Sequence, residues 1–163
     1  MEVRAPNIKA TSELVPGELF YHLGAGGSVL CIAGRWAGAE GAAELRIVPL
    51  VYPQSPQSVG VPIYETHFSG KALVLDNVTA EVLPKTYAPY SGAAIYGSSG
   101  SLFLPLTNGR SFSAGLLNLQ TGEIVDHLVE ASGFSHWRIV NVDDSDDVIW
   151  DAGASEDEQG QVG

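Results

Sequence analysis

A carboxylate and an imidazole lie two residues apart at Glu65 and His67. Residues i and i+2 of a strand share one face, so both side chains would point the same way. Carboxylate oxygens and imidazole nitrogens are common ligands of Zn²⁺ and related ions. His127 is the residue that we assign as the third ligand, with Asp126 and His136 as alternatives. The competing interpretation is that Glu65 and His67 are solvent-facing residues of an edge strand.

Two pairs of neighbours, Asp126-His127 and Ser135-His136, contain residue types of a serine hydrolase. A catalytic triad is defined by geometry, and neighbours in a strand point to opposite faces. Neither pair is therefore expected to hydrogen-bond side chain to side chain. The strained turn Gly-x-Ser-x-Gly that presents such a nucleophile is also absent, because residues 97–101 miss the final glycine. The sequence does not support a hydrolase.

Three further segments have simple structural interpretations. The glycines of residues 24–27 precede an apolar, strand-like run, which favours a hairpin loop over a phosphate-binding loop before a helix. The acidic run 143–147 lacks the glycine and the glutamate of an EF-hand, so we expect a solvated loop, with weak binding of a hard cation as an alternative. Cys31 lies in an apolar run and is expected to be a buried, unreactive thiol.

Three tyrosines, Tyr87, Tyr90 and Tyr96, lie in a segment rich in Gly, Ser and Pro that we predict to be a loop over 84–100. Tyr combines a large apolar area with a polar hydroxyl group and is enriched at interfaces. We therefore predict a contact surface here, for a protein or a carbohydrate. The alternative is that these rings belong to the core or to cross-strand pairs.

The charge of the chain argues against two classes of partner. The formal net charge is −11, and residues 143–163 hold eight of the 19 acidic residues and no Lys or Arg. A phosphate backbone or an anionic membrane surface requires clustered Lys and Arg, so nucleic acid and membrane are not expected partners.

No apolar run approaches 18 residues, and the N-terminus lacks a signal-peptide pattern, so we expect a cytoplasmic or assembly-associated protein. Nothing in the sequence implies a cofactor.

The fold is expected to be all-β, because strand-like runs alternate with glycine-rich turns and no amphipathic helical segment occurs. Residues 18–23 and 28–36 predict a hairpin whose second strand is covered on both faces. Residues 71–83 predict a strand that bends or splits at Asp76-Asn77. Asn108-Gly109 predicts a tight hairpin turn, and Gly122 a left-handed turn residue.

We therefore expect an antiparallel sandwich or barrel of about nine or ten strands. The chain divides into an extended arm over 1–16, a single β domain over 17–152 and an acidic flexible tail over 153–163.

These features favour a non-enzymatic structural or interaction protein, with protein as its partner. We expect a self-associating subunit of a larger assembly, similar to a virion or appendage component by analogy alone. The arm would suit clasping a neighbour. One alternative is a small β-barrel enzyme or sensor with a metal or small-molecule pocket. Another is an acidic inhibitor or immunity-type protein that binds a basic partner.

Overall fold

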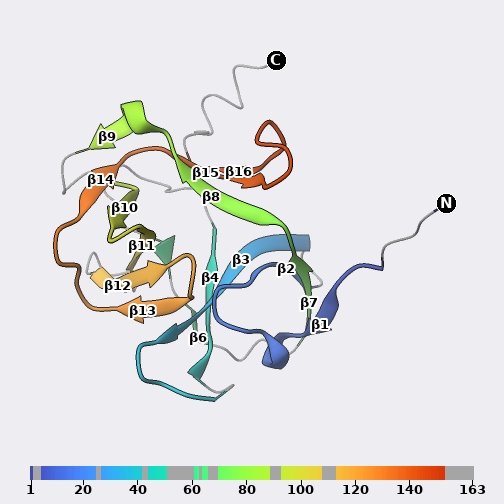
Figure 1. Ribbon diagram of the computed structural model, residues 1–163. Helices are drawn as coiled ribbons and strands as arrows, with labels where there is room; N and C mark the ends of the chain where they lie inside the picture. Colours follow the sequence, from blue (N-terminus) through green and yellow to red (C-terminus); the bar gives the residue numbers. More distant parts are fainter. Residues whose placement is uncertain are drawn as a thin grey trace.

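Strands dominate the protein (Figure 1). The computed structural model describes residues 1, 5–24, 27–41, 44–50, 61–62, 64–65, 70–88, 93–107 and 113–152. Its strands are β1 (Ile8–Ala10), β2 (Leu19–Gly24), β3 (Gly27–Trp36), β4 (Arg46–Pro49), β5 (Val61–Pro62), β6 (Tyr64–Glu65), β7 (Lys71–Leu75), β8 (Val78–Val82), β9 (Tyr87–Ala88), β10 (Ile95–Ser98), β11 (Ser101–Thr107), β12 (Ser113–Asn118), β13 (Glu123–Val125), β14 (Ser132–Phe134), β15 (Trp137–Asn141) and β16 (Val148–Asp151). Two 3-10 turns, η1 (Thr11–Glu13) and η3 (Pro84–Thr86), are the helical elements of this described part, and none of its helices is long and apolar enough to span a bilayer.

The all-β prediction is confirmed, although the strands are shorter and more numerous than expected. The large sheet follows the order β1-β7-β2-β3-β13-β12-β11-β10-β14-β9. β4 and β6 extend from β3, while β5 pairs with β11. The pairing is mainly antiparallel, with parallel pairs at β3–β13 and β5–β11.

A second, smaller sheet of order β16-β15-β8 covers part of the large one (Figure 1). The chain enters it at Asp76-Asn77, where β7 ends and β8 begins. Asn77 has a φ of 61°, a left-handed conformation that Asn tolerates better than most residues. The predicted split of the 71–83 segment is thus confirmed. At this point the chain leaves the large sheet and enters the small one.

Two apolar cores lie on opposite faces of the β2–β3 hairpin. Ile32 belongs to the core shared with the small sheet, which also contains Trp137 and Trp150. Cys31 and Ala33 belong to the second core, which Leu14 helps to close. Successive residues of β3 therefore enter different cores, which confirms that this strand is covered on both faces.

Part of the N-terminal segment predicted as an extended arm pairs with the chain's own sheet. β1 pairs with β7 in the register Ile8↔Leu73, and both Thr11 and Leu14 are buried. Residues 8–14 therefore pack on the chain's own sheet. The three residues of β1, Ile8-Lys9-Ala10, are too few to signal a strand by themselves.

Two other local predictions need correction. The hairpin of β11 and β12 is confirmed, but Thr107 pairs with Ser113, which leaves five residues between them. A two-residue turn at Asn108-Gly109 would pair Thr107 with Arg110, so that register is wrong; the turn itself lies outside the described residues. The expected loop over 84–100 contains η3, β9 and β10.

The turn between β12 and β13 is packed directly against the Pro16-Gly17 turn. Gly122 has a φ of 73°, and a Cβ built on it would overlap the backbone of Pro16 and Gly17. The Gly122 carbonyl also accepts a hydrogen bond of 2.9 Å from the Arg35 N–H group. Glycine is thus required at this position for two reasons: the backbone φ is positive, and there is no space for a Cβ atom.

We expect Gly122→Ala to lower the free energy of unfolding by at least about 2 kcal/mol more than Gly100→Ala. Gly100 has a similar φ of 79° but has open space where a Cβ would lie. In Gly100→Ala, the control, the expected cost is only that of placing alanine in a left-handed conformation, about 1–2 kcal/mol. Chemical denaturation of both variants measures the difference, and equal losses would contradict the close packing of the two turns.

Candidate functional site

Ser135 and His136, which have residue types of a serine hydrolase, contact different residues. His136 Nε2 lies 2.5 Å from Asp151 Oδ1, which links the start of β15 to the end of β16. Ser135 Oγ donates a hydrogen bond of 3.1 Å to the Thr86 carbonyl oxygen, in η3. As expected for neighbours, the hydroxyl and the imidazole are thus not joined, and both side chains connect elements of the fold. Asp126 and His127 are both exposed.

The structure describes only part of the predicted metal site. The backbone of Glu65 lies in β6, opposite Arg46 of β4, while His67 lies outside the described residues. His127 is exposed in the segment after β13. The part of the chain that the structure describes holds no group of three His, Cys, Asp or Glu side chains able to hold a metal ion. Because two of the three side chains fall outside that part, the metal site stays a prediction.

The three tyrosines have separate outcomes. Tyr87 lies in β9 at the end of the large sheet with 71% of its surface exposed, and its ring packs edge-on against Phe134 at 6.2 Å. Tyr96 lies in β10 with 7% exposed, so its expected place in a surface loop is wrong. Its pairing with Phe103 places it inside the sheet. Tyr90 lies outside the described residues.

Cys31 is buried in the second core, as expected. Desolvation by burial raises the pKa of its thiol to about 12, because the charged thiolate loses its hydration. A thiol held neutral in this way is a poor nucleophile.

The acidic hairpin between β15 and β16 is ordered by its own hydrogen bonds. The Asp144 carboxylate accepts from the Asp146 N–H group at 3.0 Å, and the Asn141 side chain accepts from the Asp143 N–H group at 3.0 Å. The amide of Asn77 donates to Asp143 Oδ2 at 2.5 Å, which ties the hairpin to the bend between β7 and β8. These bonds hold negative charge close to that bend.

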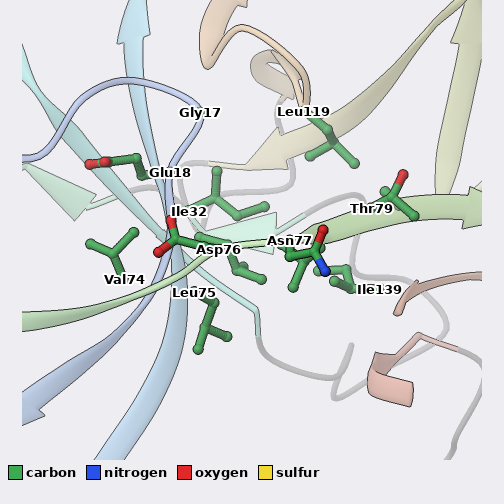
Figure 2. A pocket seen from close by; sticks show the side chains of 13 residues that line it. Gly17, Glu18, Ile32, Val74, Leu75, Asp76, Asn77, Thr79, Leu119 and Ile139 are labelled. Atoms are coloured by element: carbon green, nitrogen blue, oxygen red, sulfur yellow. The ribbon is translucent and has the colours of Figure 1, made fainter. Parts of the chain in front are cut away.

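A groove of about 290 Å³ lies at the junction of the two sheets (Figure 2). Leu19, Ile32, Leu75, Leu119 and Ile139 supply apolar surface there. The polar residues Glu18, Asp76, Asn77 and Thr79 also line it. We take this groove and the open edge at Tyr87 as the candidate functional surfaces.

The groove could not be located from the sequence, since its lining comes from five separate stretches between residues 17 and 139. The predicted bend at Asp76-Asn77 was the one available signal, because a chain that changes sheets leaves a junction behind it. The comparisons with known proteins add nothing to the geometry: no family model, no curated protein and no solved structure matches this chain.

We expect the free energy of unfolding to fall as the pH rises from 9 towards 12. Over this range the unfolded chain releases the Cys31 proton, whereas the folded chain keeps it, so alkaline pH favours the unfolded state. The decrease in the free energy of unfolding approaches about 1.4 kcal/mol for each pH unit. Denaturation at several pH values measures it.

The control for this effect is Cys31→Ala, which removes the thiol and should flatten the pH dependence over the same range. The folded wild-type protein should also react slowly with a thiol reagent at pH 8 and rapidly in denaturant. Equal pH dependence in the two proteins, or fast labelling of the folded one, would show that the thiol is accessible.

Proposed function

We propose that this protein is a non-enzymatic interaction subunit that associates with a second copy of itself through the free edge of β9. The observation that carries this proposal is the exposed aromatic side chain of Tyr87 on β9, a strand that pairs with β14 alone among the strands that the structure describes. An exposed apolar strand edge is a template for pairing with another chain, and proteins usually protect such edges.

The hydrogen bonds around β9 define which of its backbone groups point outward. Ser135 N–H donates to the Thr86 carbonyl at 2.8 Å, and Tyr87 lies opposite Phe134 in the antiparallel register. Bonded and non-bonded pairs alternate along an antiparallel ladder, so the Tyr87 pair is a non-bonded one. The N–H and C=O groups of Tyr87 therefore point away from β14, towards the free edge of the sheet.

The opposite end of the large sheet is better protected. In β1 the Ile8 N–H group donates to the Pro6 carbonyl at 3.1 Å, and Lys9 forms an ion pair with Glu18 at 2.6 Å. A charge and a proline on or beside an edge strand are known means of preventing edge-to-edge pairing. The contrast between the two ends supports β9 as the associating edge.

Two β9 strands related by a twofold axis would pair antiparallel, with each Tyr87 contributing to the same interface. β9 has two residues, so the interface would contain few hydrogen bonds. We therefore expect a weak dimer that forms with rising protein concentration, as is typical of small interfaces.

We expect Tyr87→Lys to weaken self-association by about fivefold or more. The substitution removes an aromatic contact and places two like charges on facing edges, which disfavours pairing. Sedimentation equilibrium over a range of protein concentrations measures the dissociation constant.

Val129→Lys is the matched control, because Val129 is 77% exposed and lies outside the strands. It adds the same charge and should leave the dissociation constant unchanged. A wild-type protein that stays monomeric at millimolar concentration, or equal effects of the two substitutions, would refute association through β9.

A further inference from the structure

We propose that the groove beside β8 binds an extended, basic peptide segment of a partner protein, which adds as a further strand to the free edge of β8. This inference goes beyond self-association through β9, since it concerns another strand, another sheet and a different partner. It depends on the backbone geometry of β8, the lining of the groove and the local charge.

The free edge of β8 follows from three hydrogen bonds. Val142 N–H donates to the Asn77 carbonyl at 2.9 Å, and Leu83 N–H donates to the His136 carbonyl at 3.2 Å. Both hydrogen bonds join residues that are opposite each other in the antiparallel register of β8 with β15. Because bonded and non-bonded pairs alternate along such a ladder, the backbone groups of residues 77, 79, 81 and 83 point towards β15. The third bond, from Asn141 N–H to the Asp147 carbonyl at 3.0 Å, shows that the alternate residues of β15 face β16.

The backbone groups of Val78 and Ala80 consequently point away from β15. β8 ends the small sheet, and neither residue forms a backbone hydrogen bond to another described residue outside that sheet. Unpaired donors and acceptors in a row are what an added strand requires, and such main-chain pairing supplies much of the affinity in strand-addition complexes.

The groove lies along this same edge. Val78, Thr79 and Ala80 line it from β8, and Gly17 and Glu18 line it from the segment before β2 (Figure 2). Its apolar surface includes Ile32 and Ile139, which belong to the core between the two sheets. Every second side chain of an added strand would point into the groove, because successive side chains of a strand alternate between faces.

The charge of the surroundings favours a basic occupant. The exposed carboxylate of Asp76 lies at the groove, and Asp143 is held to the same bend by Asn77. No Lys or Arg is among the lining residues. Glu18 of the lining is paired with Lys9 at 2.6 Å, and Glu81 of β8 is paired with Arg138 at 2.5 Å. Negative charge at this end of the groove is thus left for a Lys or Arg of the partner.

The same charge argues against occupants from this protein. The residues after 152 include Glu156, Asp157 and Glu158 and no basic residue, so they would be repelled by the groove. A second copy carries a net charge of −11, which disfavours its docking on an acidic surface. An extended segment of a basic partner protein fits both the edge and the charge.

The test uses the full chain and a synthetic peptide, acetyl-Val-Arg-Val-Arg-Val-amide, in isothermal titration calorimetry at low salt. We expect binding with a submillimolar dissociation constant that weakens as salt is added. The same peptide with Glu in place of both Arg residues should bind at least about tenfold more weakly, because like charges are opposed across an interface.

Two variants of the protein address the edge and the charge separately. Ala80→Pro should weaken binding about tenfold or more, because the ring removes an outward donor and blocks the edge while leaving the bonds to β15 intact. Asp76→Asn should weaken binding about two- to fivefold, as for an exposed ion pair. Asp126→Asn makes the same chemical change at an exposed site outside the groove lining and should leave affinity unchanged.

Several outcomes would overturn the proposal. These are an Arg peptide that fails to bind at millimolar concentration, equal affinity of Ala80→Pro, or equal losses from Asp76→Asn and Asp126→Asn. The last result would mean general attraction to an acidic protein. If Ala80→Pro does not fold, the two Asn variants and the Glu peptide decide alone. Tyr87→Lys should not change peptide affinity, so failure of this proposal is distinct from failure of self-association through β9.

Discussion

The burial of Trp137 between the two sheets is the contact on which the rest of the structure depends. Its side chain is 1% exposed, and its ring lies 4.7 Å from that of Trp150 on the neighbouring strand. Both belong to the core that contains Leu19 and Ile32 of the large sheet. A large aromatic side chain buries up to about 250 Å², so these two residues hold the small sheet in place.

Covering this core with three strands has a structural consequence at β8. The chain must leave β7 and change sheets within two residues, Asp76 and Asn77, which Asn77 permits by its positive φ. β8 then pairs with β15 on one side, and no other described strand pairs with it on the other side. The groove and its unpaired edge are thus by-products of the way the core is closed, and we infer that the protein uses them for binding.

The same stretch of chain supplies the second proposed contact. After β8 the chain passes through η3 and immediately forms β9, the last strand of the large sheet (Figure 1). Among the strands that the structure describes, residues 78–88 therefore contain two without a partner on one side: β9, which carries the exposed Tyr87, and β8, which lies beside the acidic groove. Separate edges would allow one subunit to contact a second copy and a basic partner at once.

Local pattern predicted much of this fold but little of its surface. The β2–β3 hairpin and the bend at Asp76-Asn77 were predictable, because alternation and turn residues act over a few positions. The parallel pairing of β3 with β13 was not, since it joins residues almost ninety positions apart. Tyr96 shows the same limit: its surroundings are typical of a loop, yet long-range pairing with β14 places it in a buried strand.

Native-state hydrogen exchange of individual amides in β8 measures whether the outer edge of this strand is free. We expect fast exchange at Val78 and Ala80, whose N–H groups point away from β15, and slow exchange at Thr79 and Glu81, whose N–H groups face β15. Slow exchange at all four amides would mean that another part of the chain already covers the edge of β8, which would contradict a binding edge there.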